Sequence, residues 1–299
     1  MTTFVGVLGW PVSHSRSPAM HNAAFEALGL DWRYELLPVE PEGFDEFVRE
    51  LPGRGFAGAN VTIPHKLRAL ALADSASEVA RATGAANTLV FGEGGGVARI
   101  DAHNTDVEGF LTALRERAPG APEGLDALVL GAGGAARAVV YALLEAGAGR
   151  VRVWNRHSKR ARELVQDFAR LRPRTPLEVV EGPQVPRSDL IVNATSVGMA
   201  APADEEGLKE AGEGVKELPL SADVWGDRQI VVDLVYRQDG TPLARFARSQ
   251  GAVCVDGFDV LVHQGAASFR LWTGTEAPLG AMRSGAQHGK TYRDRRTGT

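Results

Sequence analysis

The segment that most constrains the fold lies near the middle of the chain and reads LVLGAGGAARAVVYALLEAGA, residues 128–148. An apolar strand pattern runs directly into a glycine-rich turn and then into a helix pattern. Gly131 permits the tight turn, Gly133 lets backbone amides approach a pyrophosphate, and Ala136 lets the helix pack close to the strand. A glycine-rich turn without a ligand is the alternative, but this setting favours dinucleotide binding. The expected cofactor loop comprises Gly131, Ala132, Gly133, Gly134 and Ala135.

The end of the next strand indicates which dinucleotide is bound. NAD enzymes usually place Asp or Glu there to hold the ribose 2′-hydroxyl, whereas this strand is followed by Asn155, Arg156, His157, Ser158, Lys159 and Arg160. The span 150–162 holds six Lys or Arg and no acid, although the whole chain has a net charge of −4. Guanidinium groups form strong charge-assisted bonds to phosphate, so this cluster predicts NADP. A solvated basic helix start is the weaker alternative, because cations are disfavoured at a helix N-terminus.

Strand and helix patterns alternate along the chain, which is typical of an α/β fold with parallel sheets. Strands are expected at 4–9, 32–39, 55–63, 125–130, 150–155, 177–180, 189–195 and 230–236. Helices are expected at 19–30, 41–51, 104–117, 158–171 and 258–274, with another ending at 147 and a hairpin at 91–100. The order of the later elements fits the two βαβ halves of a doubly wound Rossmann domain.

Four domain segments follow from this order. We expect a first α/β domain over 1–103, the Rossmann domain over 104–256, a helix packing back on the first domain over 257–282, and a disordered tail over 283–299. The acidic insertion 203–217 is expected to be a mobile surface flap.

Composition excludes several classes of protein. With 299 residues, 44% of them hydrophobic, the chain can bury the cores of two domains. No apolar run approaches the roughly 18 residues of a membrane span, and the N-terminal residues lack a signal-peptide pattern, so we expect a cytoplasmic protein. The negative net charge argues against a nucleic-acid surface. The seven histidines lack ligand spacing, so no metal site is expected, and the single Cys254 is expected to be an inert thiol.

Polar residues interrupt the apolar pattern at four places in the first domain. In NVTIPHK, residues 60–66, Asn60 and Thr62 point to one side of a strand, and Lys66 follows at its carboxyl end, where α/β proteins bind ligands. Asn87-Thr88 opens a strand, and Asn104-Thr105-Asp106 opens a helix, although each could also be a turn or cap. In SHSRSP, Ser17 and Pro18 are expected at the N-cap and first position of a helix, where Ser15 and Ser17 could hold a carboxylate.

Together these segments resemble the shikimate dehydrogenase family. GWPVSHSRSPAMHN (9–22) and NVTIPHK (60–66) are the most specific motifs, and GAANT (84–88) and NTD (104–106) continue them. In the second half the resemblance extends through GAGGAAR (131–137), NATSVGM (193–199), DLVY (233–236) and GFDVLVHQ (257–264). It covers about residues 4–275 and departs from the usual pattern at Ala102, at Val107 and after Tyr236.

The resemblance implies NADP-dependent reduction of 3-dehydroshikimate to shikimate, a step of chorismate and aromatic amino acid biosynthesis. It implies that Lys66 and Asp106 form the catalytic pair. Ser15, Ser17 and Tyr236 would hold the substrate carboxylate, and Thr62, Asn87, Asp106 and Gln264 its hydroxyls. Glu78, Leu234 and Gly257 would line the cofactor.

Two other functions fit the same residues. A quinate/shikimate dehydrogenase of broader specificity would share the scaffold, and so would a catalytically inactive NADP-binding sensor. Retention of both Lys66 and Asp106 argues against the sensor. Which of the two gives up the transferred proton stays open, because interacting groups titrate as a pair. A monomer and a homodimer are both compatible with the sequence.

Overall fold

The computed structural model describes residues 2–94, 97–171, 175–199, 217–221, 224–226 and 228–289. The chain forms two compact units, which we call unit 1 (Met1–Thr105 with Leu261–Thr299) and unit 2 (Asp106–Val260). The expected acidic flap at 203–217 falls almost entirely outside the described residues. Within the described ranges, no helix is both long and apolar enough to span a membrane.

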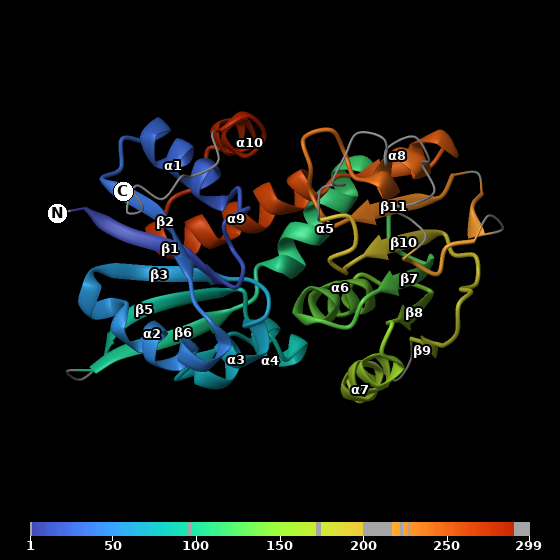
Figure 1. The fold of residues 1–299 in the computed structure, drawn as a ribbon, viewed down its shortest axis with the longest axis horizontal. Coiled ribbons are helices and arrows are strands. Elements are labelled where there is room, and N and C mark those ends of the chain that lie inside the picture. Colours follow the sequence, from blue (N-terminus) through green and yellow to red (C-terminus); the bar gives the residue numbers. More distant parts are fainter. Residues whose placement is uncertain are drawn as a thin grey trace. The chain divides into compact units, whose positions relative to one another are not determined.

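Unit 1 is built on a six-stranded sheet in the order β2-β1-β3-β5-β6-β4 (Figure 1). Its strands are β1 (Thr3–Gly9), β2 (Trp32–Pro38), β3 (Phe56–Val61), β4 (Ser75–Ala76), β5 (Thr88–Gly94) and β6 (Val97–His103). Strands β1, β2 and β3 are parallel, whereas β5 runs antiparallel to both β3 and β6. The hairpin expected at 91–100 is confirmed by the antiparallel pair of β5 and β6, so the sheet of unit 1 is mixed.

The helices of unit 1 are α1 (Ser17–Ala27), α2 (Phe44–Glu50), α3 (Lys66–Leu72), α4 (Glu78–Thr83), α10 (Leu279–His288) and the later part of α9 (Gly257–Thr273), with 3-10 turns at η1 (Pro41–Gly43) and η2 (Pro52–Arg54). Phe44 and Val48 of α2 pack with Leu8, Leu89 and Ile100 of the sheet in one buried core.

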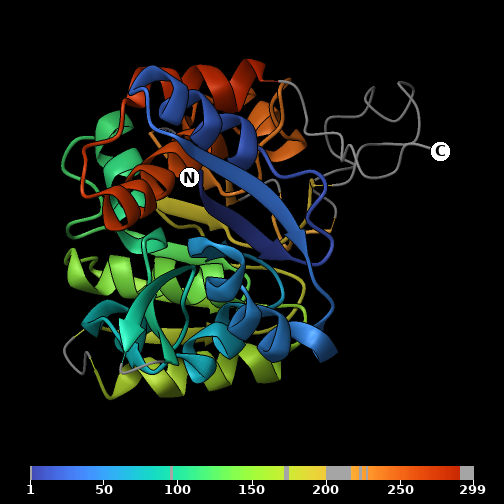
Figure 2. The same cartoon turned by 90° about the vertical axis from the view of Figure 1, so that its left-hand side faces the viewer.

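Helix α10 packs along α1, as both views of the ribbon show (Figures 1 and 2). The expectation of a disordered tail is wrong for residues 283–288, because they belong to α10. This helix buries Met282, Gly285 and Ala286. Residues 290–299 of that expected tail lie outside the described residues.

A buried aromatic cluster surrounds His21 of α1. The His21 ring stacks on Tyr34 of β2 with centroids 4.4 Å apart and planes 5° apart, and it also lies against Phe25, Phe269 and Trp272. His21 is fully buried, and neither ring nitrogen has a hydrogen-bond partner among the described residues. Burial lowers the pKa of His21 to about 3, so the ring is neutral at physiological pH.

Unit 2 contains a second six-stranded sheet, and all of its strands are parallel. The strands are β7 (Asp126–Leu130), β8 (Arg150–Trp154), β9 (Leu177–Val180), β10 (Leu190–Asn193), β11 (Ile230–Asp233) and β12 (Val253–Val255). The helices are α5 (Asp106–Arg117), α6 (Gly134–Glu145), α7 (Ser158–Ala169) and α8 (Pro242–Ser249), and α9 begins in this unit. The order β9-β8-β7-β10-β11-β12 is the doubly wound order of a Rossmann domain, as the sequence predicts.

The central strands of unit 2 are apolar along almost their whole length. All residues of β10 and β11, and all but the first of β7, are buried. Helices cover both faces of such a sheet, so a polar side chain on either face is buried and needs a hydrogen-bond partner. Asp233, the last residue of β11, is a buried acid among these apolar strands.

The depressed pKa of His21 predicts how stability depends on pH. The unfolded chain takes up a proton on this histidine below pH about 6.5, whereas the folded chain does so only near pH 3, so the free energy of unfolding falls as pH falls through this window. Between pH 7 and pH 5 the contribution is about 2 kcal/mol.

Denaturant unfolding of the wild type and a His21→Phe variant at both pH values measures this contribution. The wild type should lose about 2 kcal/mol more than the variant between pH 7 and pH 5. Asp233, whose pKa burial raises to about 6, titrates equally in both proteins and cancels in the comparison. Equal losses in the two proteins would contradict a neutral, buried His21.

Candidate functional site

In unit 2 the glycine loop follows β7 at the point where the strand order of the sheet reverses. Gly131 has φ of +115°, and a Cβ on it would lie 2.8 Å from the carbonyl oxygen of Ala194, so the position requires glycine. Gly133 is the N-cap of α6, and a Cβ on it would have no described atom within 4 Å. The first turn of α6, with Gly134 and Ala135, is thus open to a ligand that accepts hydrogen bonds from backbone amides.

Fewer cations are available to a ligand at the start of α7 than the six Lys and Arg counted over residues 150–162. Arg152 is buried and lies 3.4 Å from Asp126 and 3.7 Å from Glu178, and Arg162 pairs with Glu181. These two guanidinium groups are paired with acids of the same unit.

Three exposed cations of this segment lie at the helix start: Arg156, Lys159 and Arg160. Within the described chain, Arg156 and Arg160 have no ion-pair partner, and Lys159 lies 3.9 Å from Glu163. Asn155 shapes the turn by donating to the carbonyl oxygen of His157 at 2.9 Å. The structure therefore presents cations next to the helix start at Ser158, where a phosphate could bind.

A turn after β11 brings together Leu234, Tyr236 and Gly257. A Cβ on Gly257 would lie 2.6 Å from the carbonyl oxygen of Val235, so the start of α9 approaches this turn as closely as only glycine allows. The ring of Tyr236 lies 5.1 Å from that of Phe258.

Asp233 holds this turn in place. Its carboxylate accepts hydrogen bonds from Asn193 at 2.9 Å, from the backbone amide of Val235 at 3.1 Å and from the hydroxyl of Thr241. Burial raises its pKa to about 6. Asn193 and Asp233 belong to the motifs NATSVGM and DLVY but have no predicted role; their occurrence at the carboxyl ends of neighbouring apolar strands is the signal that could have identified them.

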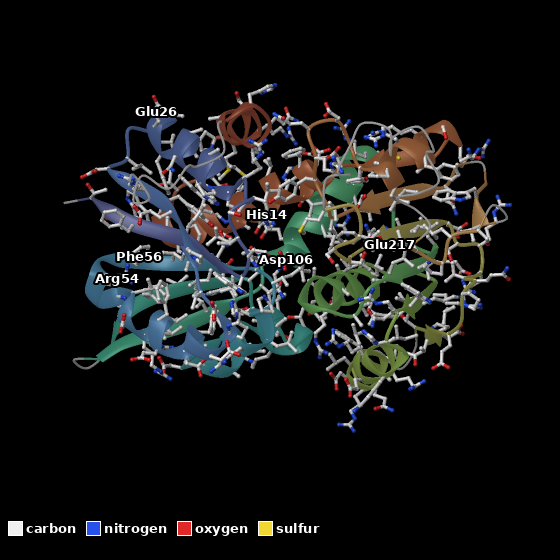
Figure 3. The ribbon with its side chains drawn as sticks, in the orientation of Figure 1. His14, Glu26, Arg54, Phe56, Asp106 and Glu217 are labelled. Atoms are coloured by element: carbon white, nitrogen blue, oxygen red, sulfur yellow. The ribbon has the colours of Figure 1, made fainter. Side chains whose placement is uncertain are left out.

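In unit 1, Ser15 and Ser17 are both buried at the start of α1. The Oγ of Ser15 accepts from the backbone amide of Ser17 at 3.3 Å. The expected N-cap at Ser17 is wrong by one residue, because Arg16 is the N-cap and its backbone is already near the helical region. Both hydroxyls still lie at the helix start, as expected; His14 precedes them on the loop from β1 (Figure 3).

The NVTIPHK segment connects to the other polar segments through the backbone. Thr62 donates its amide to Leu8 of β1 at 2.8 Å, and Lys66, the first residue of α3, accepts at its carbonyl from Ala86 at 2.8 Å. The amide of Val61 donates to the carbonyl of Asn87 at 2.8 Å. Residues far apart in sequence therefore meet at the carboxyl ends of β1 and β3.

A set of hydrogen-bonded polar side chains in unit 1, which we call the Asn60 network, is buried except for the half-buried Gln264; its members are Tyr34, Asn60, Asn87, Thr88, Thr105, Gln264 and Ser268. Asn60 is 5% exposed, and β3 lies between β1 and β5 in the sheet, so this polar position of the strand is buried. Asn87 donates to Gln264 at 3.2 Å and accepts from the amide of Thr105 at 2.7 Å. The structure thus joins two predicted substrate residues, Asn87 and Gln264, by a direct hydrogen bond.

Three further predicted site residues lie at the starts of helices. Glu78 is the exposed first residue of α4 in unit 1, and Asp106 is the first residue of α5 in unit 2, directly after Thr105 of the Asn60 network (Figure 3). Lys66 belongs to unit 1, so its pairing with Asp106 stays a prediction.

Comparison with known proteins places these segments in one family. A family model described as the shikimate dehydrogenase substrate binding domain matches residues 7–89. A model described as shikimate / quinate 5-dehydrogenase matches residues 114–210, and one described as the shikimate 5′-dehydrogenase C-terminal domain matches residues 257–284.

Curated relatives and a solved structure agree with these matches. A protein of Methanopyrus kandleri named shikimate dehydrogenase (NADP(+)) is 42% identical over 94% of each chain, and one of Nitrobacter winogradskyi with the same name is 44% identical over 90% of this chain and 89% of its own. The shikimate 5-dehydrogenase of Thermus thermophilus, solved in complex with NADP(H) and shikimate, is 39% identical with a TM-score of 0.80, covering 97% of this chain and all of its own. At this identity and coverage, the chain belongs to the shikimate dehydrogenase family.

Proposed function

We propose that this protein is an NADP-dependent shikimate dehydrogenase, which interconverts 3-dehydroshikimate and shikimate in chorismate and aromatic amino acid biosynthesis. The observation that carries the proposal is that relatives with this name match 94% of the chain at about 42% identity, across both units. We further propose that it acts in the cytoplasm as a monomer or homodimer on small-molecule substrates, without a nucleic-acid partner.

The residues of unit 2 fit NADP. The open N-terminus of α6 at Gly133 and Gly134 would bind the pyrophosphate, and Arg156 with Lys159 and Arg160 would bind the 2′-phosphate. The proposed cofactor residues also include Glu78, Gly131, Ala132, Ala135, Asn155, His157, Ser158, Leu234 and Gly257. NADPH, when bound, supplies the hydride that the ketone carbon accepts.

For the substrate we propose two kinds of contact. The Ser15 and Ser17 hydroxyls, at the positive end of α1, would hold the carboxylate together with Tyr236. Thr62, Asn87, Gln264 and Asp106 would bind the ring hydroxyls. The side-chain Oδ1 of Asn87 accepts from the Thr105 amide, which turns its Nδ2 toward Oε1 of Gln264, the other amide proposed to bind the hydroxyls.

Lys66 and Asp106 are proposed as the catalytic pair. The ketone oxygen gains negative charge as hydride arrives, so an ammonium or a protonated partner at that oxygen lowers the barrier by donating a proton.

Replacing Lys66 with alanine should lower kcat for shikimate oxidation by about 10²- to 10⁴-fold with a much smaller change in KM, because the proton-transfer group is lost from the transition state. Asp106→Asn should lower kcat similarly and also raise the KM for shikimate. Arg68→Ala, which removes an exposed cation from the same helix as Lys66, is the control and should leave kcat unchanged. A Lys66→Ala variant that keeps most of its kcat would refute the assignment.

Replacing Arg156 with alanine should raise the KM for NADP by about tenfold or more while leaving NAD use nearly unchanged, since the 2′-phosphate is the only difference between the cofactors. Arg162→Ala, in the helix α7 that follows Arg156, removes a guanidinium that is paired with Glu181 and is the matched control. Steady-state kinetics with both cofactors measure the effect. Equal losses with NADP and NAD would show that Arg156 supports the fold instead.

The two serines predict a preference for shikimate over quinate. Shikimate carries a planar, conjugated carboxylate, whereas quinate adds a hydroxyl on an sp³ carbon that turns its carboxylate out of the ring plane. A buried hydroxyl without a partner costs about 1 to 3 kcal/mol, so kcat/KM for shikimate should exceed that for quinate by at least about fivefold.

Ser15→Ala or Ser17→Ala should weaken shikimate binding and narrow this preference, whereas Ser249→Ala, at the end of α8 in unit 2, should change neither. The measurement is kcat/KM for each acid with NADP. Comparable values for the two acids in the wild type would instead favour a quinate/shikimate dehydrogenase of broader specificity.

A further inference from the structure

Several members of the Asn60 network have no role in the proposed chemistry. Tyr34 lies on β2, Asn60 on β3 and Ser268 on α9, and all three are buried in unit 1. Each nevertheless hydrogen-bonds within a continuous set that ends at Asn87 and Gln264. A buried polar group without a hydrogen-bond partner is costly, so loss of one bond in this network is expected to affect the hydrogen bonds of Asn87 and Gln264.

The first bond of the network fixes the orientation of one amide. The Tyr34 hydroxyl donates to Oδ1 of Asn60 at 2.8 Å. The Nδ2 of Asn60 must then face the other way, where it donates to Ser268 Oγ at 2.9 Å, to Thr88 Oγ1 at 3.0 Å and to the carbonyl of Asn87 at 3.1 Å. The backbone carbonyl of Asn87 can only accept, so it keeps Nδ2 on this side, and the phenol is the donor that satisfies Oδ1.

The far end of the network is oriented by the backbone. The amide of Thr105 can only donate, and it lies 2.7 Å from Oδ1 of Asn87. The Nδ2 of Asn87 therefore faces Oε1 of Gln264 at 3.2 Å, and the Nε2 of Gln264 donates to the carbonyl of Leu261 at 2.9 Å. Both amides proposed to bind substrate hydroxyls are held in one orientation.

Three hydroxyls connect the two ends. Thr88, Thr105 and Ser268 lie within 3.2 Å of one another. A hydroxyl has a single hydrogen, so its direction is set by its neighbours: Ser268 Oγ donates to the backbone carbonyl of Gln264 at 3.0 Å, and Thr88 Oγ1 donates to Oδ1 of Asn87 at 3.1 Å. The two hydroxyls that accept from Asn60 therefore contact the Asn87 side chain and the backbone of α9 at Gln264.

We propose that Tyr34, Asn60 and Ser268 are positioning residues for substrate recognition, because they hold the Thr88 and Thr105 hydroxyls that contact the Asn87 side chain, which in turn hydrogen-bonds Gln264. The stack of Tyr34 on the neutral His21 ring holds the phenol in place for this purpose. The inference rests on the proposed function, which assigns Asn87 and Gln264 to the substrate.

The kinetic test uses Tyr34→Phe, which keeps the stacked ring and removes only the hydroxyl. The KM for shikimate should rise by about 5- to 30-fold, the factor expected for one lost buried hydrogen bond, while the KM for NADP should stay within about twofold of wild type. Ser268→Ala removes a hydroxyl from the opposite side of Asn60 and should act in the same direction. Tyr141→Phe makes the same chemical change at a half-buried tyrosine of α6 in unit 2 and should change neither KM.

A second readout does not depend on the substrate. In ligand-free protein, the side-chain amide NMR resonances of Asn87 and Gln264 should shift in Tyr34→Phe and in Ser268→Ala, and should not shift in Tyr141→Phe. If wild type fails to oxidise shikimate, the proposed function fails, and these resonances still show whether the network orients the two amides.

Two outcomes would overturn the inference. In one, both variants keep the wild-type KM for shikimate and lose only thermal stability, which would make the network purely structural. In the other, the Asn87 and Gln264 resonances are unchanged in both variants, which would show that Tyr34 and Ser268 do not influence these amides.

Discussion

The side-chain amide of Asn60 lies buried in the middle of unit 1, and the loops that carry the proposed substrate residues depend on its hydrogen bonds. It joins β2 through Tyr34, β5 through Thr88 and α9 through Ser268. A buried amide must find partners for its oxygen and both hydrogens, so the surrounding elements have little freedom to move independently. The hydrogen bonds of Asn60 therefore hold β2, β5 and α9 in fixed positions next to Asn87, a predicted substrate residue. A site that distinguishes one ring acid from another needs side chains held in this way.

Unit 2 achieves comparable rigidity by close backbone approach. Gly131 lies against Ala194, and Gly257 lies against Val235, at distances that exclude any side chain. Between these points Asp233 ties the end of β11 to Asn193 and Thr241. These contacts tie the carboxyl ends of β7, β10 and β11 together, whereas the cations at the start of α7, Arg156, Lys159 and Arg160, are exposed.

Much of this arrangement is predictable from the sequence because it depends on local patterns. The glycine turn at 131–136 and the run of apolar strands predict the doubly wound sheet of unit 2, and the paired motifs predict Lys66 and the Ser15–Ser17 segment. The count of six cations overstates the phosphate site, since Arg152 and Arg162 pair with acids that only the fold brings near. Tyr34 and Ser268 could not be found, because they meet Asn60 from 26 and 208 residues away. Helix α10 was missed because a polar, basic segment can still be ordered by packing on α1.

The most direct test of this account is the appearance of NADPH absorbance when the purified wild-type protein is mixed with NADP and shikimate. The account predicts a rate that saturates with shikimate and that is much lower when NAD replaces NADP. Binding of NADP without shikimate-dependent formation of NADPH would contradict it and would favour a catalytically inactive NADP-binding protein on the same scaffold.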